Sequence, residues 1–250
     1  MLKAIAIFGL LGSVGVAQAL TISPARIELS GDPGSPVSGE VLLINEQDAD
    51  QTFYTSVENF EAQGESGTPN FSASKEGLAS WVTVTDKVVL KKGERAKVEF
   101  TVSVPKDADA GGHFAAIFFS TMPPTSSGAQ VAVGAKVGML ILLRVSGDIK
   151  EGGGPLSFTL KEDAHFVTAL PVSFIYRFNN SGNDRSNPIG AISIRNMIGL
   201  ETAHLNANPS QGNVLPNSTR RFEVIWGDEA PLPASASYWD HVRYEARNFA

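Results

Sequence analysis

The sequence predicts an all-β protein in which two immunoglobulin-like β-sandwiches follow an export signal. Apolar residues alternate with polar ones along most ordered segments, and clusters of glycine, proline and asparagine separate these segments. About seven such strands fall within roughly 130 residues, which is the number and spacing of an immunoglobulin-like sandwich. We therefore expect a signal peptide at 1–19, a sandwich at 20–148, a linker at 149–155 and a second sandwich at 156–250.

The first residues have the three parts of a secretory signal peptide. Lys3 supplies a basic start, residues 4–16 are apolar, and Ala17-Gln18-Ala19 has the small residues of a cleavage site. The apolar stretch is shorter than the roughly 20 residues of a membrane-spanning helix. We expect cleavage before Leu20, with an uncleaved N-terminal anchor as the alternative. In either case the protein is exported to the periplasm or the cell surface.

Residues 96–104 show the strand pattern most plainly, because every even-numbered residue is apolar and the odd-numbered ones are polar. Residues 131–145 form a longer run whose second half is apolar on both faces, so we expect that half to be buried on both sides. The other strands of the first sandwich are expected at 22–29, 37–45, 52–60, 81–84 and 113–121. Turns are expected at 31–34, 62–70, 91–94 and 105–112, and a single helical turn at 74–78.

The second half repeats this organisation after the linker, whose three glycines and one proline are typical of a flexible joint or a strained turn. Strand patterns return at 172–179, 192–195 and 222–226. Residues 238–250 are aromatic and charged, and no closing strand follows them. We therefore expect the second sandwich to be incomplete, with a short capping helix at 239–248 as the alternative.

Composition excludes several classes of function. The chain has no cysteine, so it forms no disulfide and offers no thiol nucleophile or zinc knuckle. Its formal net charge is -6 and no basic stripe is visible, which argues against a nucleic-acid partner. The lysines and arginine between 87 and 97 are interleaved with Glu94 and Glu99, so we interpret this cluster as a solvated strand edge.

No catalytic, cofactor-binding or metal-binding residue is predicted. The four histidines are scattered, and the acidic loops at 46–50 and 107–109 lack the spacing and central glycine of a calcium loop. No GxSxG nucleophile motif occurs, and the glycines at 152–154 precede a proline instead of a helix. Residues 215–219 are interpreted as a turn, because they lack the ending of a sortase signal. The protein is therefore expected not to be an enzyme.

Binding is the remaining kind of function. Trp81 is predicted to pack in the core, with a sugar platform as the alternative, whereas Tyr54, Glu58 and Phe60 share one strand face that is expected to be exposed. An open sandwich edge offers a second route, since it accepts a partner strand. Specific binding residues stay unassigned at this point.

Arg26 is the one strong positive charge in the first strand. We expect a structural role for it, either guarding a strand edge or pairing with Glu28 or Glu40. A role in binding is the alternative.

Several stretches together resemble the N-terminal domain of the WxL-interacting protein family of bacterial surface proteins, and more loosely that of periplasmic pilus chaperones. In the first half these are SPARIEL (23–29), PG (33–34) with GEV (39–41), Trp81 with LKKGE (90–94), and VP (104–105) with GGHF (111–114). In the second half, FNNSGN (178–183), PIG (188–190) and LPNSTR (215–220) resemble a following immunoglobulin-like domain of such envelope proteins.

The resemblance implies a non-catalytic envelope module that binds surface proteins or cell-wall glycan. Members often continue into a C-terminal membrane anchor, which this chain would need a further extension to carry. Pilus chaperones carry a basic pair that grips the terminal carboxylate of a subunit. Arg26 matches the first member of that pair by position, and no second lysine aligns with the other member.

Three functions stay open. The first is an exported scaffold that binds envelope proteins or wall polymer without cofactors and should show only shallow surfaces and free edges. The alternative is a periplasmic assembly chaperone that uses β-strand addition, and it requires Arg26 to point into a cleft between the domains beside a second cation. The third, a carbohydrate-active enzyme, requires two carboxylates about 5–9.5 Å apart in a concave site.

Overall fold

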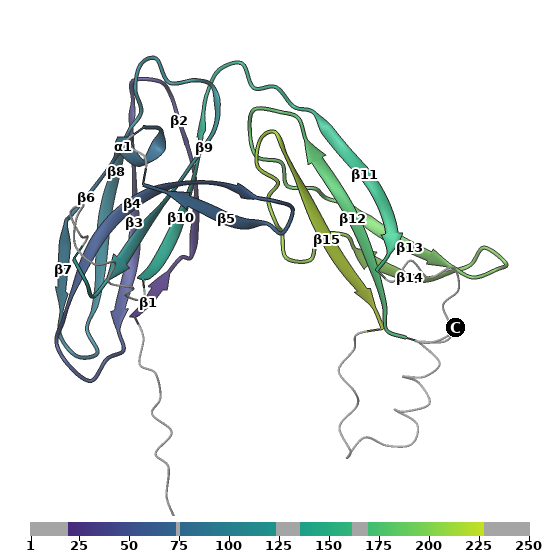
Figure 1. Cartoon of the computed structure of the whole chain (residues 1–250), viewed down its shortest axis with the longest axis horizontal. Coiled ribbons are helices and arrows are strands. Elements are labelled where there is room, and N and C mark those ends of the chain that lie inside the picture. The colour runs from purple at the N-terminus through teal and green to yellow at the C-terminus, as the bar shows by residue number, and fades with distance from the viewer. Residues whose placement is uncertain (1–19, 74–75, 124–135, 162–169, 228–250) are drawn as a thin grey trace, which may run out of the picture.

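The computed structural model describes residues 20–73, 76–123, 136–161 and 170–227, and these form two β-sheet lobes set at an angle to each other (Figure 1). The all-β, two-sandwich architecture predicted from the sequence is confirmed. Within the described residues, no helix has the length and hydropathy needed to cross a membrane.

The first lobe consists of two packed sheets. One sheet has the order β1 (Leu20–Ser23), β3 (Pro36–Asn45), β8 (Arg95–Ser103) and β6 (Val82–Val84). The other has the order β2 (Arg26–Gly31), β10 (Lys136–Val145), β9 (Gly111–Ser120), β4 (Gln51–Gln63) and β5 (Thr68–Ser72), with β7 (Lys87–Leu90) also paired to β4. Their inner faces enclose one large core, in which the even-numbered residues of β8 are buried as their alternation predicts.

The expected first strand is divided between the two sheets. Residues 20–23 pair antiparallel with β3, whereas residues 26–31 pair in parallel with β10. The prediction of one continuous strand at 22–29 is therefore wrong. The chain changes sheets at Pro24-Ala25, because proline provides no amide hydrogen to continue the ladder.

Two further elements differ from their predicted places. Residues 68–72 form a strand of their own, so the expected turn at 62–70 is a β-hairpin made by β4 and β5. The short helix α1 lies at Leu78–Trp81, not at 74–78. The place of such elements depends on the strands that pack beside them, and local composition contains no information about those neighbours.

Among the described residues, the first four of β10 have no strand paired on the side of β2, and we call this stretch the free edge of β10. β9 pairs with the whole of β10, but β2 pairs only with residues 140–145. Residues 131–135 of the predicted long strand lie outside the described part of the chain. Arg26, the first residue of β2, therefore stands where the paired part of β10 meets its free part.

The second lobe has a three-stranded and a two-stranded sheet. The first has the order β11 (Gly153–Leu160), β12 (Val172–Asn180) and β15 (Ser218–Trp226), and the second pairs β13 (Ala191–Arg195) with β14 (Glu201–Asn206). β11 begins inside the stretch expected as a linker. A small core around Tyr176, Val214, Phe222 and Val224 lies between the sheets.

One loop of the second lobe fixes the junction between the lobes. The side-chain amide of Asn183 donates hydrogen bonds to the carbonyls of Ala110 and Asp148, at 3.0 and 2.9 Å, and its oxygen accepts one from the amide of Lys150 at 2.8 Å. The next residue, Asp184, forms an ion pair of 3.3 Å with Arg144 at the end of β10. The end of β10 is thereby attached to the second lobe.

Candidate functional site: a basic cleft between the lobes

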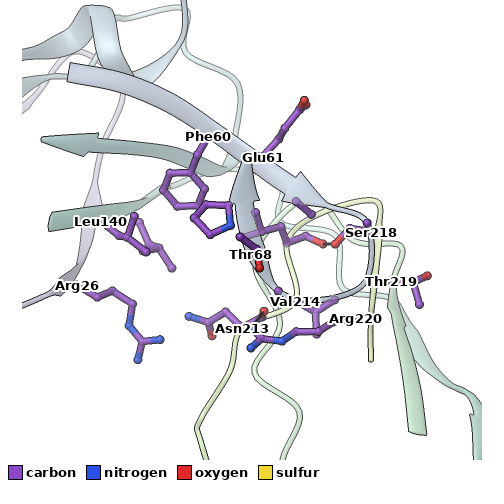
Figure 2. A pocket seen from close by; sticks show the side chains of 16 residues that line it. Arg26, Phe60, Glu61, Thr68, Leu140, Asn213, Val214, Ser218, Thr219 and Arg220 are labelled. Atoms are coloured by element: carbon purple, nitrogen blue, oxygen red, sulfur yellow. Dashed lines mark hydrogen bonds between the residues drawn. The ribbon is translucent and has the colours of Figure 1, made fainter. Parts of the chain in front are cut away.

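A pocket lies at the junction of the two lobes, with walls from three parts of the fold (Figure 2). Arg26, Leu140 and Leu142 belong to β2 and β10 of the first lobe. The β4–β5 hairpin forms a second wall, from Phe60 to Pro69. The third wall comes from the second lobe, where residues between 213 and 220 lead into β15.

Arg26 enters this pocket because it is the first residue of β2, beside Leu140 of β10. Its Nε lies 3.5 Å from a carboxylate oxygen of Glu28, so the predicted pairing with Glu28 is present. Arg26 still lines the pocket, and its side chain is 38% exposed, which leaves it accessible to a ligand. The pairing with Glu28 therefore leaves Arg26 in the lining of the pocket.

Arg220 is the second cation of the pocket. It belongs to β15, and its guanidinium lies between Gly67 of the hairpin and Gly212, both positions where a Cβ atom would overlap the side chain of Arg220. One terminal NH₂ donates to the carbonyl of Asn213 at 2.8 Å. The Nε atom is buried and has no hydrogen-bond partner among the described residues.

The charges around the pocket favour an anion. Burial lowers the pKa of Arg220, the charge of Tyr176 opposes this, and the charge of Arg26 lowers the pKa further, so the two cations act on each other. Arginine nevertheless remains protonated in proteins. Two positive charges in a partly desolvated cleft are therefore stabilised when a carboxylate binds between them.

Glu28 is the acid nearest to Arg26, and it is shared with the second lobe. Its oxygens accept hydrogen bonds from Arg185 at 3.0 Å and from Asn213 at 3.3 Å. Burial acts to raise the pKa of Glu28, but the hydrogen bond and charge of Arg185 outweigh it, with help from Asn213 and Arg26, and lower the pKa. Glu28 thus stays ionised and divides its charge between two arginines.

The remaining acid of the pocket lining, Glu61, points away from the cavity (Figure 2). Apolar side chains also line the pocket, among them Phe60, Leu140 and Leu142, and Asn213 lies between the two arginines (Figure 2). The described lining therefore combines two cations with polar and apolar side chains, and it does not bring together the two acids that glycan cleavage requires.

Other residues singled out from the sequence lie elsewhere. Trp81 packs at the edge of the first core, with its ring 4.7 Å from that of His113. Phe60 is buried and lines the cleft, so the prediction that it is exposed is wrong. Tyr54 and Glu58 lie earlier in β4, and Glu58 forms an ion pair with Lys136. The basic cluster at 87–97 is exposed, as expected. Tyr238, Trp239 and Tyr244 lie outside the described residues.

Sequence reasoning missed Arg220. It directly follows the stretch 215–219 that was interpreted as a turn, and the second cation was sought among lysines. The available signal was its place at the start of a strand, directly after a loop rich in asparagine and glycine. Its partner in the cleft is in the other lobe, and a one-dimensional pattern contains no such information.

Neither a family model nor a curated protein matches the chain, so the resemblance to WxL-interacting proteins is not supported. Among solved structures, the chain is similar to the class 5 fimbriae chaperone CfaA, with 13% identity and a TM-score of 0.47 over 87% of this chain and 95% of that chain. The chain is also similar to the E. coli chaperone DraB, with 14% identity and a TM-score of 0.43 over 87% of this chain and 86% of that chain. A third similar structure is the CsuC–CsuE chaperone–tip adhesion subunit complex of Acinetobacter baumannii, with 16% identity and a TM-score of 0.41 over 82% of this chain and 90% of that chain. At identities this low, no functional residue is carried over from these proteins.

Proposed function

We propose that the protein is an exported assembly chaperone, which holds an extended segment of a partner protein by β-strand addition and binds its terminal carboxylate in the cleft. The observation that carries this proposal is the meeting of Arg26 and Arg220, from different lobes, in one pocket beside a free strand edge. This is the arrangement that the chaperone hypothesis required. A scaffold with only shallow surfaces does not require two arginines from different lobes to line one pocket.

The free edge of β10 has the hydrogen-bonding groups that a guest strand needs. The amide of Leu140 donates to the carbonyl of Ala25, so the even-numbered residues of β10 turn their backbone groups toward the β2 side. By the same alternation, the backbone N–H and C=O groups of Lys136 and Gly138 point to this side, and β2 does not extend far enough to pair with these residues. A guest strand placed there extends the sheet in line with β2.

The position of Arg26 fixes the direction of the guest strand. If its terminal carboxylate binds at Arg26, the guest runs beside β10 from residue 136 toward residue 140. It is then parallel to β10, as β2 is. The apolar walls of the cleft, with Phe60, Leu140 and Leu142, accept the last side chains of the guest.

The predicted signal peptide supports export, and the proposed place of action is the periplasm, where unassembled envelope proteins must be kept from aggregating. The partner is thus an envelope protein with an exposed, extended C-terminal segment. The proposal does not require cell-wall glycan, since the two cations of the described cleft provide for the carboxylate of a protein partner.

A peptide titration tests the proposal. The probe is a ten-residue peptide of alternating valine and serine, prepared with a free C-terminal carboxylate and as the C-terminal amide. We expect the acid to bind about 10–100 times more tightly than the amide, because charge-assisted hydrogen bonds are lost in the amide. Lys97→Gln removes one exposed positive charge far from the cleft and serves as the control. Equal binding of the two peptides to the wild-type protein overturns the proposal.

A further inference from the structure

The β4–β5 hairpin extends from the first lobe to the second. β4 pairs with β9 only as far as Asn59, and beyond that point β4 and β5 pair with each other alone. The hairpin therefore projects past the sheet, and Figure 1 shows it reaching toward β15. A projecting two-stranded ribbon is stable only marginally by itself, so its tip needs contacts at its far end.

The tip makes these contacts through Glu65. The carboxylate of Glu65 accepts two hydrogen bonds from the guanidinium of Arg177 on β12, one of them from Nε at 2.7 Å. The backbone carbonyl of Glu65 also accepts a hydrogen bond of 2.8 Å from the amide of Arg221 on β15. A bidentate pair together with a backbone bond fixes both the distance and the orientation of the tip.

Gly67, two residues farther along, is the point at which the tip touches the cleft. Its φ of 77° is in the left-handed region, and a Cβ atom there would overlap the guanidinium of Arg220. The backbone at Gly67 is therefore one side of the slot that holds Arg220, and Gly212 is the other side. The slot orients the side chain that supplies the second cation of the cleft.

We infer that the hairpin tip is a positioning device: Glu65 attaches the tip to the second lobe, and Gly67 holds Arg220 in the orientation that binds a carboxylate. This inference rests on the proposed function for its effect on binding. Its geometric part concerns the ligand-free protein and is measured separately.

The chain offers a matched pair of variants for the test. Gly67→Ala and Gly199→Ala both place an alanine at positive φ in the turn of a β-hairpin, but nothing lies within 4 Å of a Cβ atom at Gly199, which is not part of the pocket lining. We expect Gly67→Ala to weaken binding of the acid peptide about tenfold, and Gly199→Ala to change it less than about twofold. In the ligand-free protein, the ¹⁵N signal of Arg220 Nε should shift in Gly67→Ala and stay in place in Gly199→Ala.

A cross-link gives a second, independent measurement. Since the chain has no cysteine, Glu65→Cys with Arg221→Cys creates a single disulfide across the backbone hydrogen bond, where the Cα atoms are expected within about 4.4–6.8 Å. We expect the oxidised form to retain the Arg220 Nε signal and the peptide affinity, and the reduced form to lose both, as Glu65→Gln does.

The two proposals fail in different ways. If the wild-type protein does not distinguish acid from amide, the proposed function fails, whereas the Arg220 signal still decides whether the tip orients this side chain. If Gly199→Ala and Gly67→Ala have equal effects on that signal, or if oxidation of the cysteine pair restores neither property, the positioning role of the hairpin is overturned.

Discussion

Arg26 of β2 and Arg220 of β15 line one pocket from opposite sides of the junction between the lobes, and neither charge is fully compensated. Arg26 Nε lies 3.5 Å from a carboxylate oxygen of Glu28, but Glu28 also forms an ion pair with Arg185. Arg220 has a backbone carbonyl as its partner and no acid among the described residues. Both charges attract a carboxylate that enters this pocket, which is the physical basis of the proposed function.

The free edge of β10 is tested by a proline. Lys136→Pro and Lys136→Ala both remove the ammonium group that pairs with Glu58, but only proline also removes the edge-facing amide. We expect the proline variant to bind the acid peptide about 2–10 times more weakly than the alanine variant, the effect of one backbone hydrogen bond. Isothermal titration measures the difference. Identical affinities for the two variants would be incompatible with strand addition at this edge.

Asn45 should be important for the stability of the first lobe. Its buried side-chain amide donates to the carbonyls of Ala49, Leu90 and Lys91 at 2.9–3.2 Å. Asn45→Ala leaves these acceptors without a donor, and we expect it to lower the free energy of unfolding by about 2–4 kcal/mol. Urea denaturation is the measurement, and Asn70→Ala, at an exposed position, is the control with an expected change below about 0.5 kcal/mol.

Asn183 should set the angle between the lobes. Asn183→Ala removes its bonds to Ala110, Asp148 and Lys150, whereas Asn187→Ala removes two bonds, with Gln211 and Asn208, that stay within the second lobe. We expect small-angle scattering of Asn183→Ala to require a broader range of lobe orientations, and that of Asn187→Ala to match the wild-type protein. Indistinguishable scattering from all three proteins would show that other contacts fix the angle.

The ion pair of the hairpin tip should depend on pH. The hydrogen bond from Arg177 lowers the pKa of Glu65; burial opposes this, and the charges of Arg177 and Arg221 lower the pKa further. Because the pKa is lowered in the folded state, the stabilisation is complete above the ordinary pKa of glutamate and is lost as the pH falls through the lowered value. We therefore expect it to disappear below about pH 4.

A ¹³C titration of the Glu65 carboxyl group measures this directly. Its midpoint should rise toward the ordinary value in Arg177→Gln and remain low in Lys97→Gln, since Lys97 pairs with Glu40 far from the tip. A midpoint that is the same in the wild-type protein and in Arg177→Gln would show that the pair does not form in solution.

The sequence predicts the strands well because each sheet of a sandwich has one face toward the core and one face toward the solvent. The alternation in β8 follows from this requirement, and it is visible without any knowledge of neighbours. The division of the first strand at Pro24 and the hairpin of β4 and β5 depend on which strands pair, which local patterns do not contain.

The candidate site was predicted only in part, for the same reason. Arg26 is conspicuous as a lone cation in an apolar strand, and a cleft for it was anticipated under one hypothesis. Arg220 becomes significant only when β15 approaches β2 across the junction and two glycines leave room for its guanidinium. Contacts between residues of different lobes are set by tertiary packing and have no periodic signature.

The most direct test of the central claim observes both arginines at once. The ¹⁵N–¹H signals of Arg26 Nε and Arg220 Nε are followed by NMR while the valine–serine peptide is added as the acid and then as the amide. We expect both signals to shift with the acid, with one common dissociation constant, and neither to shift with the amide. Movement of only one signal, or equal movement with both peptides, would contradict the binding of a carboxylate between the two lobes.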